Sequence, residues 1–176
     1  GIPVEIPPGV FLQASAEGEQ ILAKLVVEAA EGTRVADLYC GVGTFALPLA
    51  AAGAKVMAVD GDAAALGALA RAAGTAGFGG NVTTETRDLV RRPLAAADFK
   101  RIETIVFDPP RAGAPAQAEE IARSGAARIV AVSCNPATFA RDALTLSEGG
   151  YTLERITPVD QFVWSGHVEL VAVFSK

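Results

Sequence analysis

Short apolar runs alternate with segments of helical spacing along most of this 176-residue chain. The runs are five or six residues long and rich in valine, isoleucine or alanine, which is typical of buried strands. Strands that alternate with helices pair in parallel and carry helices on both faces of the sheet. We therefore expect strands at 34–39, 55–60, 81–85, 102–107 and 128–133, and helices at 17–31, 44–52, 62–76, 116–124 and 137–147.

The last two predicted strands, 151–158 and 168–174, have only a loop between them. That loop is too short for the crossover helix that a parallel connection needs, so the two strands are expected as an antiparallel pair at one edge of the sheet. The segment 91–100 is expected as a short helix or loop. The predicted fold class is therefore α/β, a doubly wound, mostly parallel, seven-stranded and Rossmann-like sheet with an antiparallel C-terminal edge strand.

Length and composition favour a single domain over 1–176, with an extended, proline-rich segment at 1–15. No stretch of eighteen apolar residues and no signal peptide is present, which predicts a cytoplasmic protein without a membrane partner. Two cysteines and one histidine leave little room for a disulfide framework or a metal site. The chain lacks an initiator methionine, so we expect it to be a fragment of a longer protein.

Formal net charge is −5, so the domain as a whole does not attract polyanions. This balance argues against a stand-alone, nonspecific nucleic-acid binder. If the substrate is a nucleic acid, its binding depends on a local basic patch or on a part of the protein outside this chain.

A glycine turn follows the first alternating strand, and the spacing of Gly41 and Gly43 fits a dinucleotide fingerprint. Asp37 precedes the glycines, where a carboxylate would repel a pyrophosphate but attract a cation. Asp60 ends the next strand, where a carboxylate can bind both ribose hydroxyls. S-adenosylmethionine carries an ammonium, a sulfonium and a ribose without phosphate, so it suits these residues better than NAD. Asp88 is a candidate for the adenine amino group, although Asp37 and Asp88 are alternatively helix caps or turn formers.

Cys134 stands where the apolar run 128–132 gives way to an Asn-Pro pair. Ligands of open α/β sheets bind outside the carboxyl ends of the strands, so this thiol is a candidate nucleophile. Its alternative is an inert buried cysteine. Asp108 ends another strand and opens an Asp-Pro-Pro-Arg turn. The guanidinium of Arg111 can bind a phosphate or carboxylate, or alternatively make a surface ion pair.

Four motifs, at 37–45, 108–113, 133–142 and 167–169, occur in the order seen in the RNA uracil-C5 methyltransferase family, which this chain resembles. The resemblance implies the catalytic domain of a class I methyltransferase that makes 5-methyluridine in ribosomal or transfer RNA. The cofactor is then S-adenosylmethionine and its product S-adenosylhomocysteine. The family normally adds an N-terminal RNA-binding β-barrel, and some members an iron–sulfur cluster. Without that barrel, we expect this chain to bind RNA weakly.

The resemblance also implies residue roles. Cys134 corresponds to the nucleophile that adds to C6 of uracil, and Glu169 to the base that removes the C5 proton. The implied cofactor-binding residues are Gln13, Asp37, Tyr39, Gly41, Gly43, Asp60, Asp88 and Asp108, and the implied substrate-binding residues are Arg111, Asn135, Arg141 and His167.

Some assignments leave alternatives. Glu169 is otherwise a solvent-facing strand residue, His167 a structural histidine, and Arg141 part of a helix-surface ion pair. Ser15 departs from the asparagine that the family usually carries at that position. Two other functions remain open at this stage, a noncatalytic cofactor-binding module and an NAD-dependent oxidoreductase.

Overall fold

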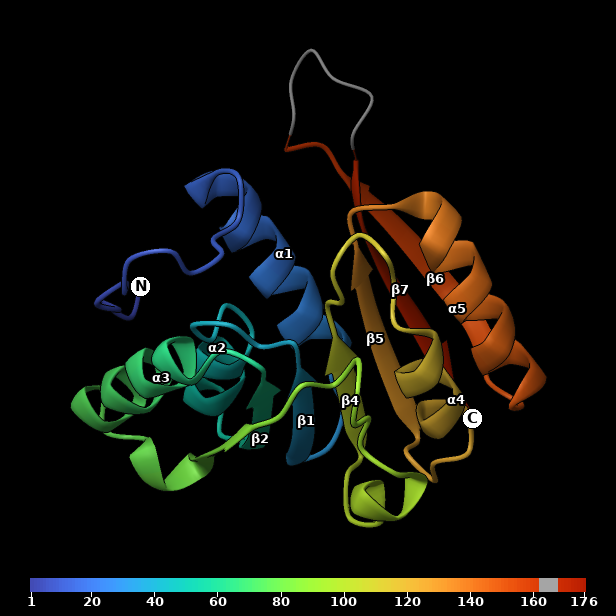
Figure 1. Ribbon diagram of the computed structural model, residues 1–176, viewed down its shortest axis with the longest axis horizontal. Helices are drawn as coiled ribbons and strands as arrows, with labels where there is room; N and C mark the ends of the chain where they lie inside the picture. The colour runs from blue at the N-terminus through green and yellow to red at the C-terminus, as the bar shows by residue number, and fades with distance from the viewer. Residues whose placement is uncertain (162–167) are drawn as a thin grey trace.

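The computed structural model describes residues 1–161 and 168–176. One seven-stranded sheet forms the centre of the molecule, in the order β3-β2-β1-β4-β5-β7-β6 (Figure 1). Five strands run parallel, as the alternating pattern predicts: β1 (Arg34–Leu38), β2 (Lys55–Asp60), β3 (Val82–Thr86), β4 (Thr104–Phe107) and β5 (Arg128–Ser133). The Rossmann-like α/β fold is therefore confirmed.

Two further strands, β6 (Thr152–Val159) and β7 (Glu169–Ser175), complete the sheet. They pair antiparallel at one end of the sheet, which confirms the expected antiparallel pair. In one detail the structure differs from the expectation, because the C-terminal strand is not the strand at the edge. β7 lies between β5 and β6 and is antiparallel to both, so β6 is the strand at the outer edge. The last strand of the chain therefore runs directly beside β5.

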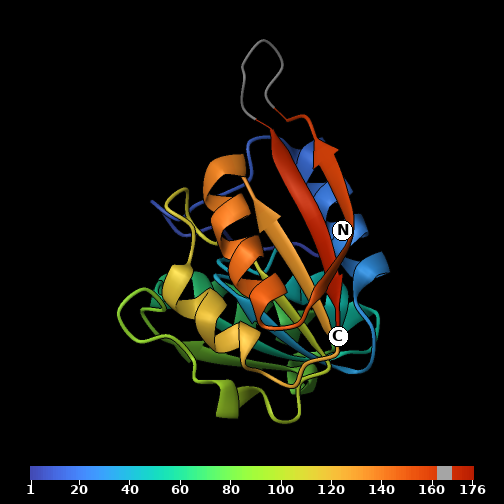
Figure 2. The same cartoon turned by 90° about the vertical axis from the view of Figure 1, so that its right-hand side faces the viewer.

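Helices cover both faces of the sheet (Figures 1 and 2). One face carries α1 (Ala16–Ala29), α2 (Ala46–Ala51) and α3 (Ala63–Thr75), and the other carries α4 (Pro115–Ala122), α5 (Pro136–Glu148) and the 3-10 turn η2 (Ala96–Phe99). A second 3-10 turn, η1 (Gly79–Asn81), precedes β3. Among the described residues, no helix is long and apolar enough to cross a membrane.

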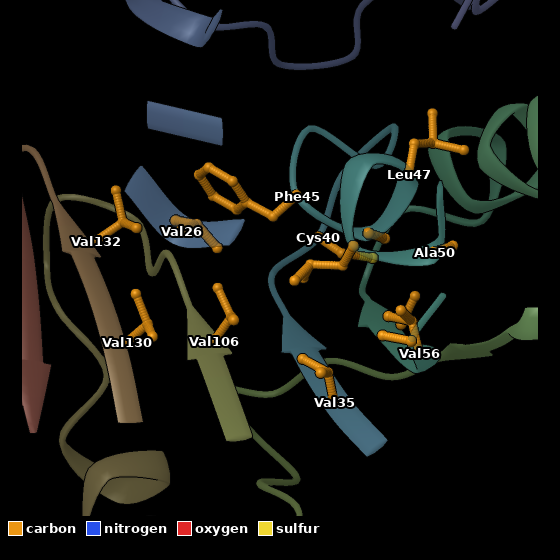
Figure 3. Close-up of a cluster of buried hydrophobic side chains, with 14 of the residues drawn as sticks. Val26, Val35, Cys40, Phe45, Leu47, Ala50, Val56, Val106, Val130 and Val132 are labelled. Atoms are coloured by element: carbon orange, nitrogen blue, oxygen red, sulfur yellow. The ribbon is translucent and has the colours of Figure 1, made fainter. Parts of the chain in front are cut away.

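Two buried clusters lie on opposite faces because successive side chains of a strand point to opposite sides. Val35 belongs to the cluster under α1 to α3, whereas Ala36 and Leu38 belong to the cluster under α4 and α5. Figure 3 shows the first cluster, in which Phe45 reaches from the turn before α2 toward Val26 of α1. Burial on both faces fixes the register of the central strands, since a shift of one residue would exchange the two faces.

The strand β1 ends at Leu38, one residue before the sequence prediction, because Tyr39 has a left-handed backbone with φ of 62°. The chain therefore turns sharply at the carboxyl end of the sheet. Segment 1–15 crosses this region as extended chain, and its side chains Val4 and Val10 pack against Val42 of the glycine turn. Ser15 then caps α1, because its hydroxyl accepts a hydrogen bond from the Gly18 amide at 3.0 Å.

Candidate active site

The glycine turn is fastened to the end of β2. Asp60 accepts the Gly41 amide at 2.8 Å through Oδ2 and the Asp62 amide at 2.8 Å through Oδ1. Gly41 and Gly43 both have left-handed backbones, with φ of 52° and 96°, and a Cβ on Gly43 would collide with Leu69. The left-handed backbone at both positions therefore favours glycine in this turn. Asp60 stands where the sequence predicts it, and its carboxylate fixes the turn that a cofactor would contact.

Asp37 is fully buried in β1, and neither of its carboxylate oxygens has a hydrogen-bond partner among the described residues. Burial raises the pKa of this carboxyl well above its usual value, and the charges of Asp108 and Asp60 raise it further. The backbone amide of Ala46 lies close enough to lower this pKa in part, but its geometry falls short of a hydrogen bond. A buried carboxylate without a partner is costly, and a bound cation would relieve that cost.

Tyr39 is half-buried, and its hydroxyl also has no partner among the described residues. Burial and then the charge of Asp142 raise the pKa of Tyr39 to about 12. Asp88 lies apart from these groups in a surface turn. It accepts the amides of Val90 and Arg91, each at 3.1 Å, and its side chain also pairs with that of Arg91. This geometry supports the turn-forming interpretation of Asp88, and its contact with adenine remains a prediction.

Gln13 and Asp108 meet at the carboxyl end of β4. The Gln13 side-chain amide donates to Asp108 Oδ2 at 3.3 Å, and Gln161 donates to Gln13 Oε1 at 3.3 Å. Burial raises the pKa of Asp108 to about 7, the charge of Glu169 adds to this, and the Gln13 hydrogen bond lowers it. The structure thus brings together three residues that are far apart in the sequence.

Cys134 follows β5 directly, and Glu169 is the first residue of β7. The antiparallel register of β5 and β7 ends at the pair Ser133 and Leu170. Cys134 and Glu169 each lie one residue beyond that last pair, on the same side of it, so the two residues come from neighbouring strand ends. Glu169 is buried, so it is not the solvent-facing residue that the sequence left as an alternative.

The electrostatics agree with this proximity. Burial raises the pKa of the Cys134 thiol, and the charge of Glu169 raises it further. A hydrogen bond from the Arg111 side chain opposes both effects, because a guanidinium favours the thiolate. Burial also raises the pKa of Glu169, and the charge of Arg111 lowers it. Thiol, carboxylate and guanidinium therefore form one interacting cluster.

Two predicted substrate-binding side chains are engaged within the protein. Asn135 caps α5 by accepting the Ala137 amide at 3.1 Å, and it donates to the Arg111 carbonyl at 3.1 Å. Arg141 donates to the Ala112 carbonyl at 3.0 Å. His167 lies outside the described residues. The structure thus brings most of the predicted site together at the carboxyl ends of β1, β2, β4 and β5.

The sequence analysis did not single out Asp142, which is buried and accepts the Ala114 amide at 2.7 Å. The signal was present in the helical spacing. Asp142 shares the buried face of α5 with Phe139 and Leu146, so it places a carboxylate on an otherwise apolar stripe.

Sheet order, glycine turn and the carboxylate at the end of β2 define the class I methyltransferase fold. This chain belongs to the tRNA (uracil-5-)-methyltransferase family, whose model matches residues 78–176, more than half of its length. It is similar to a solved tRNA (uracil-54, C5)-methyltransferase of Pyrococcus abyssi in complex with S-adenosyl-L-homocysteine, with a TM-score of 0.85 and 34% identity over 96% of this chain and 41% of that one. The expected family is confirmed.

Two curated relatives are similar over nearly the whole chain. An uncharacterized RNA methyltransferase of Brucella melitensis is 54% identical over 99% of this chain. The 23S rRNA (uracil(1939)-C(5))-methyltransferase RlmD of Pseudomonas entomophila is 42% identical over 95% of it. The chain spans 42% of the first relative and 38% of the second.

Proposed function

We propose that this chain is the catalytic part of an enzyme that transfers a methyl group from S-adenosylmethionine to C5 of a uridine in RNA. The observation that supports this best is the place of Cys134 and Glu169, each one residue beyond the last pair between β5 and β7, where Glu169 and Arg111 both act on the pKa of the thiol. A thiol and a carboxylate held on adjacent strands suit a reaction that needs a nucleophile and a base on one ring. The two solved or curated relatives with named targets methylate uracil C5 in different RNAs, so the proposal specifies RNA alone.

The residues present fit the cofactor. Asp37 offers an unpartnered buried carboxylate for the ammonium group, and Asp60 lies at the strand end where ribose hydroxyls bind. The glycine turn leaves backbone room for close approach. Asp37 and Asp60 are both acidic and would repel a pyrophosphate, which favours a ligand without phosphate. When bound, S-adenosylmethionine supplies an electrophilic methyl group.

The protein residues would act on the uracil ring in turn. The thiolate of Cys134 forms a bond to C6, and the electron pair of the C5–C6 double bond moves toward C5 and O4. C5 then forms a bond to the methyl carbon while the bond between that carbon and the sulfonium sulfur breaks. The electron pair of the broken bond stays on the sulfur, so S-adenosylhomocysteine is the leaving group. Glu169 removes the proton from C5, and the returning electron pair restores the double bond as the C6–S bond breaks. The thiolate leaves unchanged, so atoms and electrons balance.

The charges around the site suit both proton transfers, the loss of the Cys134 thiol proton and the removal of the C5 proton by Glu169. Arg111 favours the thiolate over the thiol, which partly cancels the effects of burial and of Glu169 on the Cys134 pKa. The raised pKa of Glu169 makes it a stronger base than an exposed carboxylate. Since the ring must reach a half-buried thiol, the target nucleotide is expected to leave its stack.

The test uses an RNA oligonucleotide that carries 5-fluorouridine, incubated with the chain and S-adenosylmethionine. C5 of 5-fluorouridine carries fluorine in place of hydrogen, so Glu169 has no proton to remove and the covalent adduct with Cys134 should persist. Intact-protein mass should rise by the RNA plus one methyl group, and peptide mapping should place the adduct on Cys134. Cys40 is the matched control thiol, since it is buried and burial raises its pKa.

Cys134→Ala should give no adduct and no methylation while still binding S-adenosylhomocysteine. Methylation by that variant, or an adduct on Cys40, would refute the proposal. We further propose that this chain alone binds RNA weakly, because its net charge is −5 and it spans about two fifths of its relatives. The oligonucleotide is therefore used at high concentration and low salt. Tight binding in a filter assay at physiological salt would contradict the second proposal.

A further inference from the structure

The buried carboxylate of Asp142 joins α5 to the loop that follows β4. One of its oxygens accepts the Ala114 amide at 2.7 Å, and the other pairs with Arg141 at 2.9 Å. A charge buried in an apolar helix face is costly unless it is paired and hydrogen-bonded. Asp142 meets both conditions, because it is paired with Arg141 and hydrogen-bonded to the backbone of the loop at Ala114. The buried carboxylate therefore helps to fix the position of the loop.

Three more side chains of α5 bind the same loop. Arg141 donates to the Ala112 carbonyl at 3.0 Å, while Asn135 and Thr138 both donate to the Arg111 carbonyl at 3.1 Å. The loop approaches α5 so closely that a Cβ on Gly113 would lie 2.7 Å from the Asp142 carboxylate. Backbone groups of three loop residues are thus hydrogen-bonded to one helix face.

We propose that Arg141 and Asp142 are positioning residues that hold Arg111 against Cys134. This inference rests on the proposed function, because it assigns Arg111 to the nucleophile. Cys134 immediately precedes Asn135, the N-cap of α5, and the Asn135 side chain donates to the Arg111 carbonyl at 3.1 Å. The loop that carries Arg111 is therefore bound to the residue next to the thiol. The N-terminal end of α5 thus holds both the Cys134 nucleophile and the loop that carries Arg111. Arg141 then serves the reaction through Arg111, and not through an RNA phosphate.

The charged groups that influence the Cys134 thiol come from two elements. Glu169 lies on β7, and Asp108 and Arg111 lie at the end of β4 and in the loop after it. Of these, Arg111 alone lowers the pKa of the thiol. If the loop loosens, Arg111 retreats from the sulfur while Glu169, held by the sheet, stays in place. Loosening should therefore raise the thiol pKa.

The test compares Arg141→Lys with Arg123→Lys. Arg123 also pairs with a carboxylate of its own helix, Glu120, but that pair makes no contact with the loop. The rate of Cys134 alkylation by iodoacetamide is measured from pH 6 to 10 and assigned by peptide mass mapping. For Arg141→Lys we expect the midpoint to rise by about half to one pH unit, and the rate at pH 7.5 to fall about threefold to tenfold. Arg123→Lys should match wild type.

Thr138→Val provides a second variant that keeps the shape of the side chain and removes one bond to the Arg111 carbonyl. It should shift the alkylation midpoint in the same direction by a smaller amount. Calorimetry with S-adenosylhomocysteine should give wild-type affinity for both variants, since the glycine turn is fastened to β2 through Asp60 and not to α5. That result also shows that the variants are folded.

An Arg141→Lys profile that coincides with the wild-type profile would overturn the inference. A loss of RNA affinity with unchanged alkylation would do the same, and would assign Arg141 to RNA. Alkylation requires neither RNA nor methyl transfer. Failure of the proposed function, seen as methylation by Cys134→Ala, is therefore distinct from failure of this inference.

Discussion

Gln13 donates a hydrogen bond to Asp108 across 95 positions of the chain. The bond joins the extended segment before α1 to the carboxyl end of β4. Gln161, near the end of β6, donates in turn to Gln13. A chain of amides thus orients a carboxyl whose pKa burial has raised to about 7. The contact favours the ionised form, so the pKa of Asp108 reflects a balance between desolvation and hydrogen bonding.

Asp108→Asn should stabilise the fold above neutral pH. In wild type the carboxyl has its ordinary pKa of 3.8 when unfolded and about 7 when folded, so the folded state binds the proton more tightly. The stability from this group is full below pH 4 and is lost as pH rises through 7. Asparagine avoids that loss. Urea unfolding at pH 8 should show the variant more stable by about 2–4 kcal/mol, with a gap that closes toward pH 4. A gap independent of pH would contradict the raised pKa.

Asp60→Asn should weaken cofactor binding. The carboxylate uses one oxygen for the Gly41 amide and the other for the Asp62 amide, and asparagine keeps only one acceptor. We expect the affinity for S-adenosylhomocysteine in calorimetry to fall about tenfold, or roughly 1.4 kcal/mol. Asp62→Asn is the control, because asparagine can still cap α3 at that position. Equal affinity in both variants would show that the turn does not depend on Asp60.

Gly113→Ala should destabilise the fold by about 2–4 kcal/mol. Its φ is 74°, and the new Cβ would collide with Arg141 and lie 2.7 Å from Asp142. Gly125→Ala provides the comparison. That glycine has no left-handed backbone and no atom within 4 Å of its would-be Cβ, so we expect a change below about 0.5 kcal/mol. Similar denaturation midpoints for the two variants would argue against the close approach.

Ser15→Ala should cost about 1 kcal/mol and lower the melting temperature by about 2–4 °C, because the helix loses its cap to the Gly18 amide. Ser15→Asn should melt like wild type, since asparagine caps helices equally well. If the asparagine variant melted as low as the alanine variant, the cap would not be the reason for serine at this position. Differential scanning calorimetry gives all three values.

The fold was largely predictable because its signals are local. The predicted bounds of β2 and β5 match the structure, since each is an apolar run with a clear stop. Other elements differ by a few residues where geometry overrides propensity. The predicted helix 44–52 begins only at Ala46, because the turn around Gly43 extends further. The insertion of β7 beside β5 could not be predicted, since pairing between distant strands leaves no local trace.

The sequence predicted which residues lie at the site better than it predicted their hydrogen-bond and ion-pair partners. The positions of Cys134 and Asp108 follow from the rule that ligands bind at strand ends. For Arg141 the two interpretations were an RNA phosphate and a helix-surface ion pair. The structure shows an ion pair with Asp142 of the same helix, and it adds a hydrogen bond to the Ala112 carbonyl. Only the folded chain brings a loop carbonyl to that helix. Such contacts depend on the packing of two elements and on no pattern within either.

β7 runs directly alongside β5 as far as the pair Ser133 and Leu170, and Cys134 and Glu169 each lie one residue beyond that pair. The sheet therefore limits how far the two residues can move apart when surrounding loops move. Since the sheet constrains these two positions, an evolutionary change in the ring that the site admits would have to arise in the residues around them.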